Sequence, residues 1–325
     1  MDTSRAVVVT QNGDRSVLEV QEREVKAPAA GQVQVEVLAA GINFIDVYKR
    51  QGVYPQKTPF VQGQEGAGRV LAVGHGVERF DVGEVVAWCQ AQGSQATVAN
   101  LDASQLVDVP DEVDPVDAAA VLLQGITAHY LSVSTFPIKE GHTALVHAAA
   151  GGVGQLLVQM ITARGGRVVA TAGSEEKLAI ARSLGAVAGV NYSTSDDLAE
   201  ELIAASGGGF DVVYDGVGKA TFDVSLDVLH PRGTMVLFGG ASGQVPPFDL
   251  QRLNSSGSLY ITRPSIVHYI ADLKEFEWRA REVFDLVAGG VVKVDIGGSY
   301  SFDDAAEAYE ALESRGSRGK LVLVP

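Results

Sequence analysis

Short apolar runs alternate with amphipathic stretches along the second half of the chain. The apolar runs fall at 143–148, 167–172, 188–192, 210–215 and 234–239, with a sixth at 258–262. They are continuous rather than alternating in polarity, which is typical of parallel strands covered on both faces. Stretches of helical period separate them at 154–165, 175–185, 196–208 and 219–233. This order predicts an α/β fold with a doubly wound parallel sheet.

The first part of the chain has a different pattern. Apolar runs punctuated by Gly and Pro, such as 33–41, 66–74 and 83–89, predict short strands joined by turns. An Ala- and Leu-rich stretch at 113–133 predicts a helix that connects two domains.

The C-terminal tail contains helix-like stretches at 275–290 and 303–315 and a strand at 320–325. We expect the tail to fold back onto the first part. The domains would then be 1–125 plus 265–325, which is β-rich, and an inserted α/β domain at 126–264. The active site is expected in the cleft between the two.

A glycine-rich turn follows the first apolar run of the inserted domain. Its pattern, Ala148-x-x-Gly151-x-x-Gly154, is a variant of GxGxxG, and a helical stretch follows at once. Such glycines let the backbone approach a pyrophosphate, and the helix N-terminus offers free N–H groups. The alternative is that these glycines only form a tight turn between a strand and a helix and bind no ligand. The order strand, turn, helix, strand favours a dinucleotide site.

The end of the second apolar run indicates which dinucleotide. An NAD site places an Asp or Glu there to bind the ribose 2′-hydroxyl. This chain has Thr-Ala-Gly-Ser at 171–174 and Lys177 one helical turn later. A hydroxyl, backbone N–H groups and a lysine suit a 2′-phosphate, so NADPH is favoured over NADH. Glu175 and Glu176 argue against this unless they face solvent in the first helical turn.

The composition of the chain argues against several classes of protein. The 325 residues suit two domains, and the net charge of −15 disfavours binding to nucleic acid. The single cysteine, Cys89, excludes an intrachain disulfide and a cysteine-rich zinc site. No apolar run approaches the roughly 20 residues of a membrane span, and the N-terminus lacks a secretory pattern. We therefore expect a cytoplasmic protein.

Eight segments together resemble the quinone oxidoreductases of the medium-chain dehydrogenase/reductase superfamily, in the zeta-crystallin-like branch. They lie at 40–55, 63–74, 147–155, 191–193, 213–218, 237–243, 258–265 and 312–325. The resemblance implies an NADPH-dependent reductase with a GroES-like β-rich domain and an inserted Rossmann domain. It also implies a homodimer or homotetramer joined through edge strands, here near 259–262.

The resemblance also implies site residues. On the acceptor and nicotinamide side these are Asn43, Tyr48, Tyr54 and Thr127, which form the catalytic set, together with Tyr130. Around the pyrophosphate and the 2′-phosphate end they are Gly152, Val153, Gly173, Ser174, Lys177 and Tyr192. Along the cofactor cleft and its borders they are Val217, Phe238, Gly239, Gly240, Arg263, Pro264 and Arg315. His147 and Asp215 are interpreted instead as structural, the histidine packed and the carboxylate bracing a turn.

Zinc-dependent members of the superfamily carry a GHE motif and a ligating Cys in the first domain. Here the motif is Gly63-Gln64-Glu65, and Asp46 stands at the Cys position. The six histidines show no H-x-x-H spacing, so a metal-free enzyme is expected.

The hypothesis is hydride transfer, or electron transfer, from NADPH to a quinone or another electron-poor acceptor held at near-attack distance. Tyr48, Tyr54 or water could deliver a proton. Two alternatives remain at this point. One is an enone or enoyl-thioester reductase of the same superfamily, and the other is a non-enzymatic NADPH-binding protein with a structural or RNA-binding role.

Overall fold

The computed structural model describes residues 3–314 and 318–325. The chain folds into two compact units. The first unit comprises Met1–Gln124, Leu273–Gly290 and Val294–Pro325, and the second comprises Gly125–Asp272 and Val291–Lys293. Residues 265–272, which the sequence pattern placed with the tail, lie in the second unit.

The first unit is built on two sheets. The larger sheet has the order β15-β16-β3-β5-β6-β8, with β7 also paired to β3, and the smaller has the order β2-β1-β4. The strands of the larger sheet are β3 (Gln32–Gly41), β5 (Glu65–Val73), β6 (Val85–Trp88), β7 (Val98–Asp102), β8 (Val107–Asp108), β15 (Ile296–Ser301) and β16 (Lys320–Val324). Those of the smaller sheet are β1 (Thr3–Val9), β2 (Leu18–Glu24) and β4 (Phe60–Val61).

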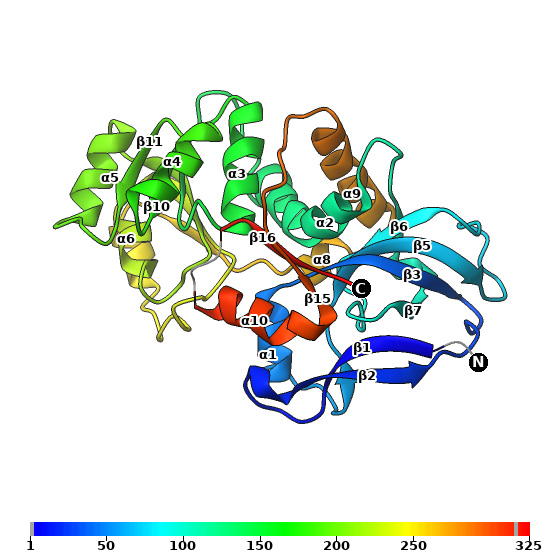
Figure 1. The fold of residues 1–325 in the computed structure, drawn as a ribbon. Helices are drawn as coiled ribbons and strands as arrows, with labels where there is room; N and C mark the ends of the chain where they lie inside the picture. The colour runs from blue at the N-terminus through cyan, green and yellow to red at the C-terminus, as the bar shows by residue number, and fades with distance from the viewer. Residues whose placement is uncertain (1–2, 315–317) are drawn as a thin grey trace. The chain divides into compact units, whose positions relative to one another are not determined.

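The C-terminal strand joins the N-terminal part of the chain in one sheet. β16 pairs antiparallel with β3, with Leu323 opposite Ala40, and β3 in turn pairs with β5 (Figure 1). Strand β3 buries alternate residues, because Val33, Val35 and Val37 face the core that also contains Trp88. The period of two expected of a strand with one covered face therefore holds here.

Helices and 3₁₀ turns lie between these strands along the chain. The helices of the first unit are α1 (Phe44–Arg50), α9 (Leu273–Ala288) and α10 (Ala305–Glu313), with 3₁₀ turns η1 (Arg15–Val17), η2 (Ala103–Gln105) and η4 (Phe302–Asp304). The Ala- and Leu-rich stretch forms α2 (Pro115–Tyr130), which continues as a π-helical segment, η3 (Leu131–Thr135). The α2 helix crosses from the first unit into the second at Gln124.

The second unit is a parallel sheet with the order β11-β10-β9-β12-β13-β14, and every pairing in it is parallel. Its strands are β9 (Thr143–Val146), β10 (Arg167–Ala172), β11 (Ala188–Asn191), β12 (Phe210–Asp215), β13 (Leu229–Leu237) and β14 (Tyr260–Thr262). Numbered within the sheet, this is the order 3-2-1-4-5-6 of a Rossmann domain. The predicted fold class is therefore confirmed.

Four helices fall in the predicted helical stretches: α3 (Gly152–Ala163), α4 (Glu175–Ser183), α5 (Leu198–Ser206) and α6 (Phe222–Asp227). The helix predicted at 219–233 is shorter than expected, because β13 already begins at Leu229. Two short helices were not predicted: α7 (Gln251–Ser255), before β14, and α8 (Ile266–Tyr269), after it. Figure 1 shows α3, α4 and α5 flanking the β10 and β11 edge of the sheet. The first strand, β9, is fully buried, as expected of a central parallel strand covered on both faces.

One helical segment of the described residues, Pro115–Thr135, is long and apolar enough to cross a membrane by length and composition. The expectation that no stretch approaches this length was therefore wrong for this segment. However, 67% of its apolar window is buried inside the protein, and core helices pass the same test.

Candidate functional site

The glycine-rich turn connects the end of β9 to α3. Ala148 adopts a left-handed conformation (φ 50°), and its carbonyl accepts a hydrogen bond from the Gly151 N–H at 2.9 Å. Gly151 is the N-cap of α3, so the helix begins at Gly152. The first N–H groups of a helix have no partner inside the helix, so those of Gly152 and Val153 suit an anion.

Gly154 is required for close packing of α3 on this turn. A Cβ at Gly154 would lie 2.5 Å from the Ala148 carbonyl oxygen and 2.8 Å from the Ala149 Cα. Both neighbours are backbone atoms, which cannot rotate away. This close approach is the role that the third glycine has in a dinucleotide-binding turn. The turn therefore fits the pyrophosphate of NADPH.

The adjacent strand ends bring together the four residues predicted for the 2′-phosphate. Ser174 is the N-cap of α4, and its Oγ accepts from the Lys177 N–H at 3.3 Å. The Tyr192 N–H donates to the Ala172 carbonyl, which holds the end of β11 against β10. A Cβ at Gly173 would lie 2.8 Å from the Tyr192 hydroxyl, so the phenol covers this glycine.

The two glutamates that follow Ser174 face solvent. Glu175 and Glu176 are exposed, and Glu175 forms a surface ion pair with Arg182 at 3.3 Å. They occupy the first turn of α4, where the helix dipole favours acidic side chains. The carboxylate that an NAD site places at the end of the second strand is therefore absent from residues 171–174.

Hydrogen bonds join the turn after β12 to the turn after β13. Phe238 N donates to the Asp215 carbonyl at 2.8 Å, and Ser242 donates to the Val217 carbonyl through both its N–H and its hydroxyl. A Cβ at Gly239 would clash with the Gly216 carbonyl oxygen. Val217, Phe238, Gly239 and Gly240 thus lie together and partly exposed at the carboxyl end of the sheet. Open α/β sheets bind their ligands at this end.

The remaining predicted residues of the second unit are more scattered. Arg263 is exposed and Pro264 is buried, directly after β14. Thr127 and Tyr130 are buried on α2, and Tyr130 stacks on Tyr269 at 4.1 Å between ring centroids and 6° between planes. Sequence reasoning missed Tyr269, because a stacking partner 139 positions away leaves no local pattern.

In the first unit, both the nitrogen and the oxygen of the Asn43 side-chain amide form buried hydrogen bonds. Its Nδ2 donates to Glu65 Oε2 at 2.7 Å, and its Oδ1 accepts from Lys320 Nζ at 2.7 Å. Lys320 and Glu65 also form an ion pair at 2.5 Å, and both side chains are at most 3% exposed. A buried pair of this kind is stable only when its other hydrogen-bonding positions are filled.

The backbone around Glu65 fills those positions. Glu65 Oε1 accepts from the Leu123 N–H at 2.6 Å. A Cβ at Gly41 would lie 2.5 Å from Glu65 Oε2, so glycine is needed beside the carboxylate. Sequence reasoning missed the role of Lys320; the only local signal is a single charge at the start of an otherwise apolar terminal strand.

Asp46, which the resemblance in the sequence places at the cysteine position of the zinc-dependent members, has a structural role in this structure. It forms a capping box with Asn43, whose N–H donates to Asp46 Oδ2 at 2.9 Å. Within the described part of the chain, Asp46 Oδ1 is buried and has no hydrogen-bond partner. Burial raises the pKa of Asp46 to about 7, against the favourable hydrogen bond from Asn43.

The two candidate tyrosines lie next to each other on and after α1. The Tyr48 and Tyr54 rings meet edge to face, with centroids 5.8 Å apart and planes at 85°. Tyr54 is 47% exposed, while Tyr48 is half-buried. Together they form an aromatic surface that is partly open to solvent. Arg315, the remaining predicted residue, lies outside the described residues.

Across residues 3–314 and 318–325, no group of three or more His, Cys, Asp or Glu side chains could hold a metal ion. Gln64 occupies the histidine position of the GHE motif, and its Nε2 donates to Gln92 at 3.3 Å.

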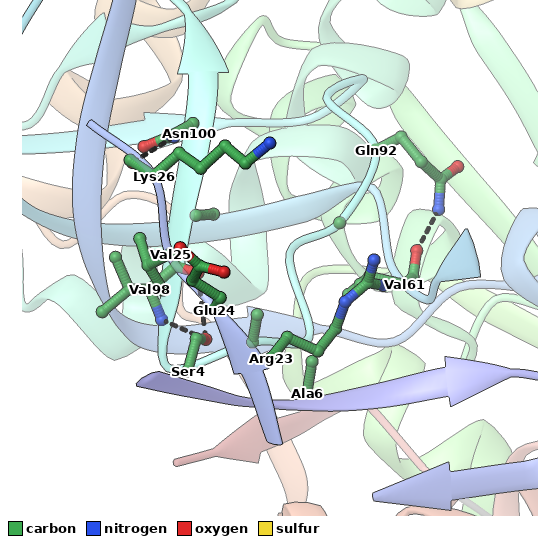
Figure 2. Close-up of a pocket in the computed structure, with 13 residues that line it drawn as sticks. Ser4, Ala6, Arg23, Glu24, Val25, Lys26, Val61, Gln92, Val98 and Asn100 are labelled. Atoms are coloured by element: carbon green, nitrogen blue, oxygen red, sulfur yellow. Dashed lines mark hydrogen bonds between the residues drawn. The ribbon is translucent and has the colours of Figure 1, made fainter. Parts of the chain in front are cut away.

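A separate cleft of about 390 Å³ opens in the first unit beside β1, β2 and β7. None of the sequence-predicted site residues that the structure describes lines it. Figure 2 shows that polar groups at its wall bond to each other: Ser4 accepts from the Val98 N–H, and the Asn100 amide donates to the Lys26 carbonyl. The cleft is distinct from the predicted catalytic residues.

Two family models match the chain. Residues 29–135 match the "Alcohol dehydrogenase GroES-like domain", and residues 152–279 match "Zinc-binding dehydrogenase". A quinone oxidoreductase of Salmonella typhimurium is 42% identical over 97% of this chain and 98% of its own length. A 2-haloacrylate reductase of a Burkholderia species is 38% identical over 98% of both chains.

A solved structure is equally similar. The quinone oxidoreductase of Escherichia coli, determined in complex with NADPH, superposes with a TM-score of 0.95 over the full length of both chains, at 40% identity. Identity of this level, spread over nearly the whole length of both chains, agrees with the segments that carried the resemblance in the sequence. The chain therefore belongs to the quinone oxidoreductase family of the medium-chain dehydrogenases/reductases.

Proposed function

We propose that this protein is an NADPH:quinone oxidoreductase that transfers a hydride, or electrons, to quinones or related electron-poor acceptors without a metal ion. The observation that carries the proposal is the strand end formed by Gly173, Ser174, Lys177 and Tyr192. It combines donors for a phosphate with the absence of a carboxylate, beside a glycine turn built for close backbone approach. The NADPH-bound relative from Escherichia coli supports the same cofactor.

We assign each group of residues to one part of the NADPH molecule. Gly152 and Val153 offer backbone N–H groups to the pyrophosphate. Ser174, Lys177 and Tyr192 bind the 2′-phosphate, with Lys177 as its cation and Gly173 allowing close approach. The remaining proposed contacts to the cofactor come from Thr127, Tyr130, Val217, Phe238, Gly239, Gly240, Arg263, Pro264 and Arg315.

The bound cofactor supplies a hydride from C4 of its nicotinamide. The protein's contribution is to place the acceptor and exclude water, because quinones are readily reduced and need little acid catalysis. We assign Asn43 to orient the reacting groups through its fixed amide. The edge-to-face pair of Tyr48 and Tyr54 offers an aromatic surface for a quinone ring, and a phenol or water supplies the proton.

The side chains at the expected metal-ligand positions of the first unit, Gln64 and Asp46, support a reaction without a metal ion. The amide of Gln64 is a poor zinc ligand compared with the histidine of the GHE motif. The carboxylate of Asp46 uses Oδ2 in the α1 capping box, and its Oδ1 is buried in a part of the described chain where no three acidic, histidine or cysteine side chains gather. Neither side chain is therefore arranged as a metal ligand.

A second candidate is reduction of an activated carbon–carbon double bond. The relative named 2-haloacrylate reductase favours it at 38% identity. A non-enzymatic RNA-binding role is disfavoured by the net charge of −15, and a gel shift that vanishes with salt tests it.

The deciding experiment compares acceptors at saturating NADPH. We expect kcat/KM for simple benzoquinones and naphthoquinones to exceed that for 2-chloroacrylate and for enones by at least about tenfold, a difference of about 1.4 kcal/mol in transition-state binding. Faster turnover of 2-chloroacrylate would make the second candidate the function. A protein that binds NADPH but reduces no acceptor would contradict both.

We also propose a homodimer or homotetramer in the cytoplasm. β14 pairs with β13 and is the last strand in the sheet order, so one of its edges can accept a second strand. Tyr260 on this strand is 61% exposed. Unpaired edges of this kind are sites of strand association. Sedimentation velocity tests the oligomer, since a monomer at micromolar concentration would contradict it, and cell fractionation tests the location.

A further inference from the structure

A chain of buried polar side chains links the ends of three neighbouring strands of the second unit, β10, β9 and β12, through a serine of α6. His147 Nδ1 lies 2.8 Å from Thr171 Oγ1, and His147 Nε2 lies 3.1 Å from Ser225 Oγ. Ser225 Oγ in turn donates to Asp215 Oδ2 at 2.9 Å. All four side chains are at most 1% exposed. Such a network is favourable only when each donor has an acceptor.

Asp215 is surrounded by donors on both of its oxygens. Its Oδ1 accepts from the Val217 and Gly218 N–H groups at 2.8 and 2.9 Å. Its Oδ2 accepts from Thr221 Oγ1 at 2.7 Å and from Ser225 Oγ. A carboxylate can only accept hydrogen bonds, and this environment offers it only donors.

The direction of every bond in the chain follows from this carboxylate. A serine hydroxyl has one proton, and that of Ser225 goes to Asp215. Ser225 Oγ must then accept from His147, which places the imidazole proton on Nε2. The unprotonated Nδ1 accepts from the Thr171 hydroxyl. Burial lowers the pKa of His147, which agrees with a neutral ring.

His147, Thr171 and Asp215 lie beside turns that are proposed to contact the cofactor, whereas Ser225 lies in α6. His147 directly precedes the glycine turn, and the Thr171 carbonyl accepts from the Ala149 N–H of that turn at 3.0 Å. Asp215 holds the Val217 turn through its side chain, and its carbonyl accepts from Phe238 N. The network therefore ties together the carboxyl ends of β10, β9, β12 and β13.

We propose that Thr171, His147, Ser225 and Asp215 form a positioning network for the cofactor, with His147 fixed as its Nε2–H tautomer by the distant carboxylate. None of the four side chains needs to touch NADPH. They act by fixing the turns that do, and Ser225 is the link between the histidine and the carboxylate. The functional part of this inference rests on the proposed NADPH site, whereas the tautomer does not.

The first test reads the tautomer directly. In protein labelled with ¹⁵N-histidine, with the His147 signals assigned by their loss in His147→Asn, we expect a protonated Nε2 and an unprotonated Nδ1. Asp215→Asn keeps Oδ1 for the two N–H groups but replaces Oδ2 by a donor. Ser225 must then donate to His147, and the proton is expected to move to Nδ1. An Nδ1–H tautomer in the wild type, or no change in Asp215→Asn, overturns the proposal.

The second test separates positioning from plain stability. Ser225→Ala breaks the chain and is expected to raise the Kd for NADPH on the order of tenfold, while kcat at saturating NADPH stays within about twofold. Ser206→Ala is the matched control, because Ser206 is a buried hydroxyl of the same unit that bonds to Ile203 and to Gly209 before β12, away from the proposed cofactor turns.

Ser206→Ala is expected to lower the unfolding temperature without changing the Kd. An unchanged Kd in Ser225→Ala, or an equal rise in Ser206→Ala, contradicts the positioning role. If NADPH binds as predicted but no quinone is reduced, the proposed function fails while this inference stands.

Discussion

Asp46 is a buried carboxyl group with a structural role at the start of α1. Its carboxyl lies in the interior of the first unit, caps α1 through one oxygen and leaves the other without a partner among the described residues. Burial penalises the charged form, which raises the pKa of Asp46 to about 7. The folded protein therefore binds a proton at Asp46 more tightly than the unfolded chain does.

This difference predicts a pH dependence of stability. Because the pKa in the folded state, about 7, exceeds the ordinary value of 3.8, the contribution of Asp46 is complete below about pH 4 and is lost as pH rises through 7. Its upper limit is roughly 4 kcal/mol. Asp46→Asn keeps an oxygen for the Asn43 N–H and removes the titration. We expect urea unfolding at pH 4 to 8 to show a shallower fall in the variant.

Asp303→Asn is the control for this measurement, because Asp303 is a surface carboxylate of the same unit that pairs with Arg5. It is expected to keep the slope of the wild type over this range. An identical slope in Asp46→Asn and the wild type would show that Asp46 ionises normally.

At the scale of elements, α3 packs tightly against the glycine turn that we propose binds the pyrophosphate. Gly154 lies so close to the Ala148 carbonyl that no side chain fits without moving the helix. The helix N-terminus and the turn act together on a bound pyrophosphate, so a displaced helix changes both.

Gly154→Ala is expected to cost about 1–3 kcal/mol in unfolding free energy, as overpacking does, and to weaken NADPH binding. Gly240→Ala is the matched variant, since the nearest atom to its Cβ would be at an ordinary 3.6 Å. We expect its stability to stay within about 0.5 kcal/mol of the wild type. Denaturant unfolding measures both, and equal stability of the two variants would contradict the packing argument.

Most strands and helices of the second unit were predictable because each has a strong local period and a short connection. The apolar runs became β9 to β14, and the glycine turn formed between β9 and α3 as predicted. The early start of β13 at Leu229 and the short helices α7 and α8 were not predicted. The π-helical end of α2 was not predicted either, because it depends on packing rather than on local sequence. Predicted residues near one strand end, such as Ser174 and Lys177, came together for the same local reason.

Contacts between distant residues could not be predicted. The Lys320–Glu65 pair that holds Asn43 joins residues 255 positions apart, and nothing near Lys320 in the sequence indicates its partner. The donors and acceptors in the His147 network could not be predicted either. They depend on Asp215, which is distant from His147 in the sequence and comes close only in the folded protein.

At the scale of the whole molecule, the chain combines two units, and the first is assembled from both ends of the sequence. The turns proposed to bind the cofactor lie in the second unit, whereas Asn43, Tyr48 and Tyr54 belong to the first. We propose that the second unit binds NADPH, with Lys177 selecting it over NADH, and that the three residues of the first unit contact the acceptor.

The most direct test is the ratio of kcat/KM for NADPH and NADH with a single quinone acceptor, measured in the wild type and in Lys177→Ala. Lys139→Ala, at an exposed lysine of the same unit, serves as the control. We expect the wild type and the control to prefer NADPH by at least about tenfold, and Lys177→Ala to bring the ratio close to one. Equal use of both cofactors by the wild type, or an unchanged ratio in Lys177→Ala, would contradict the account.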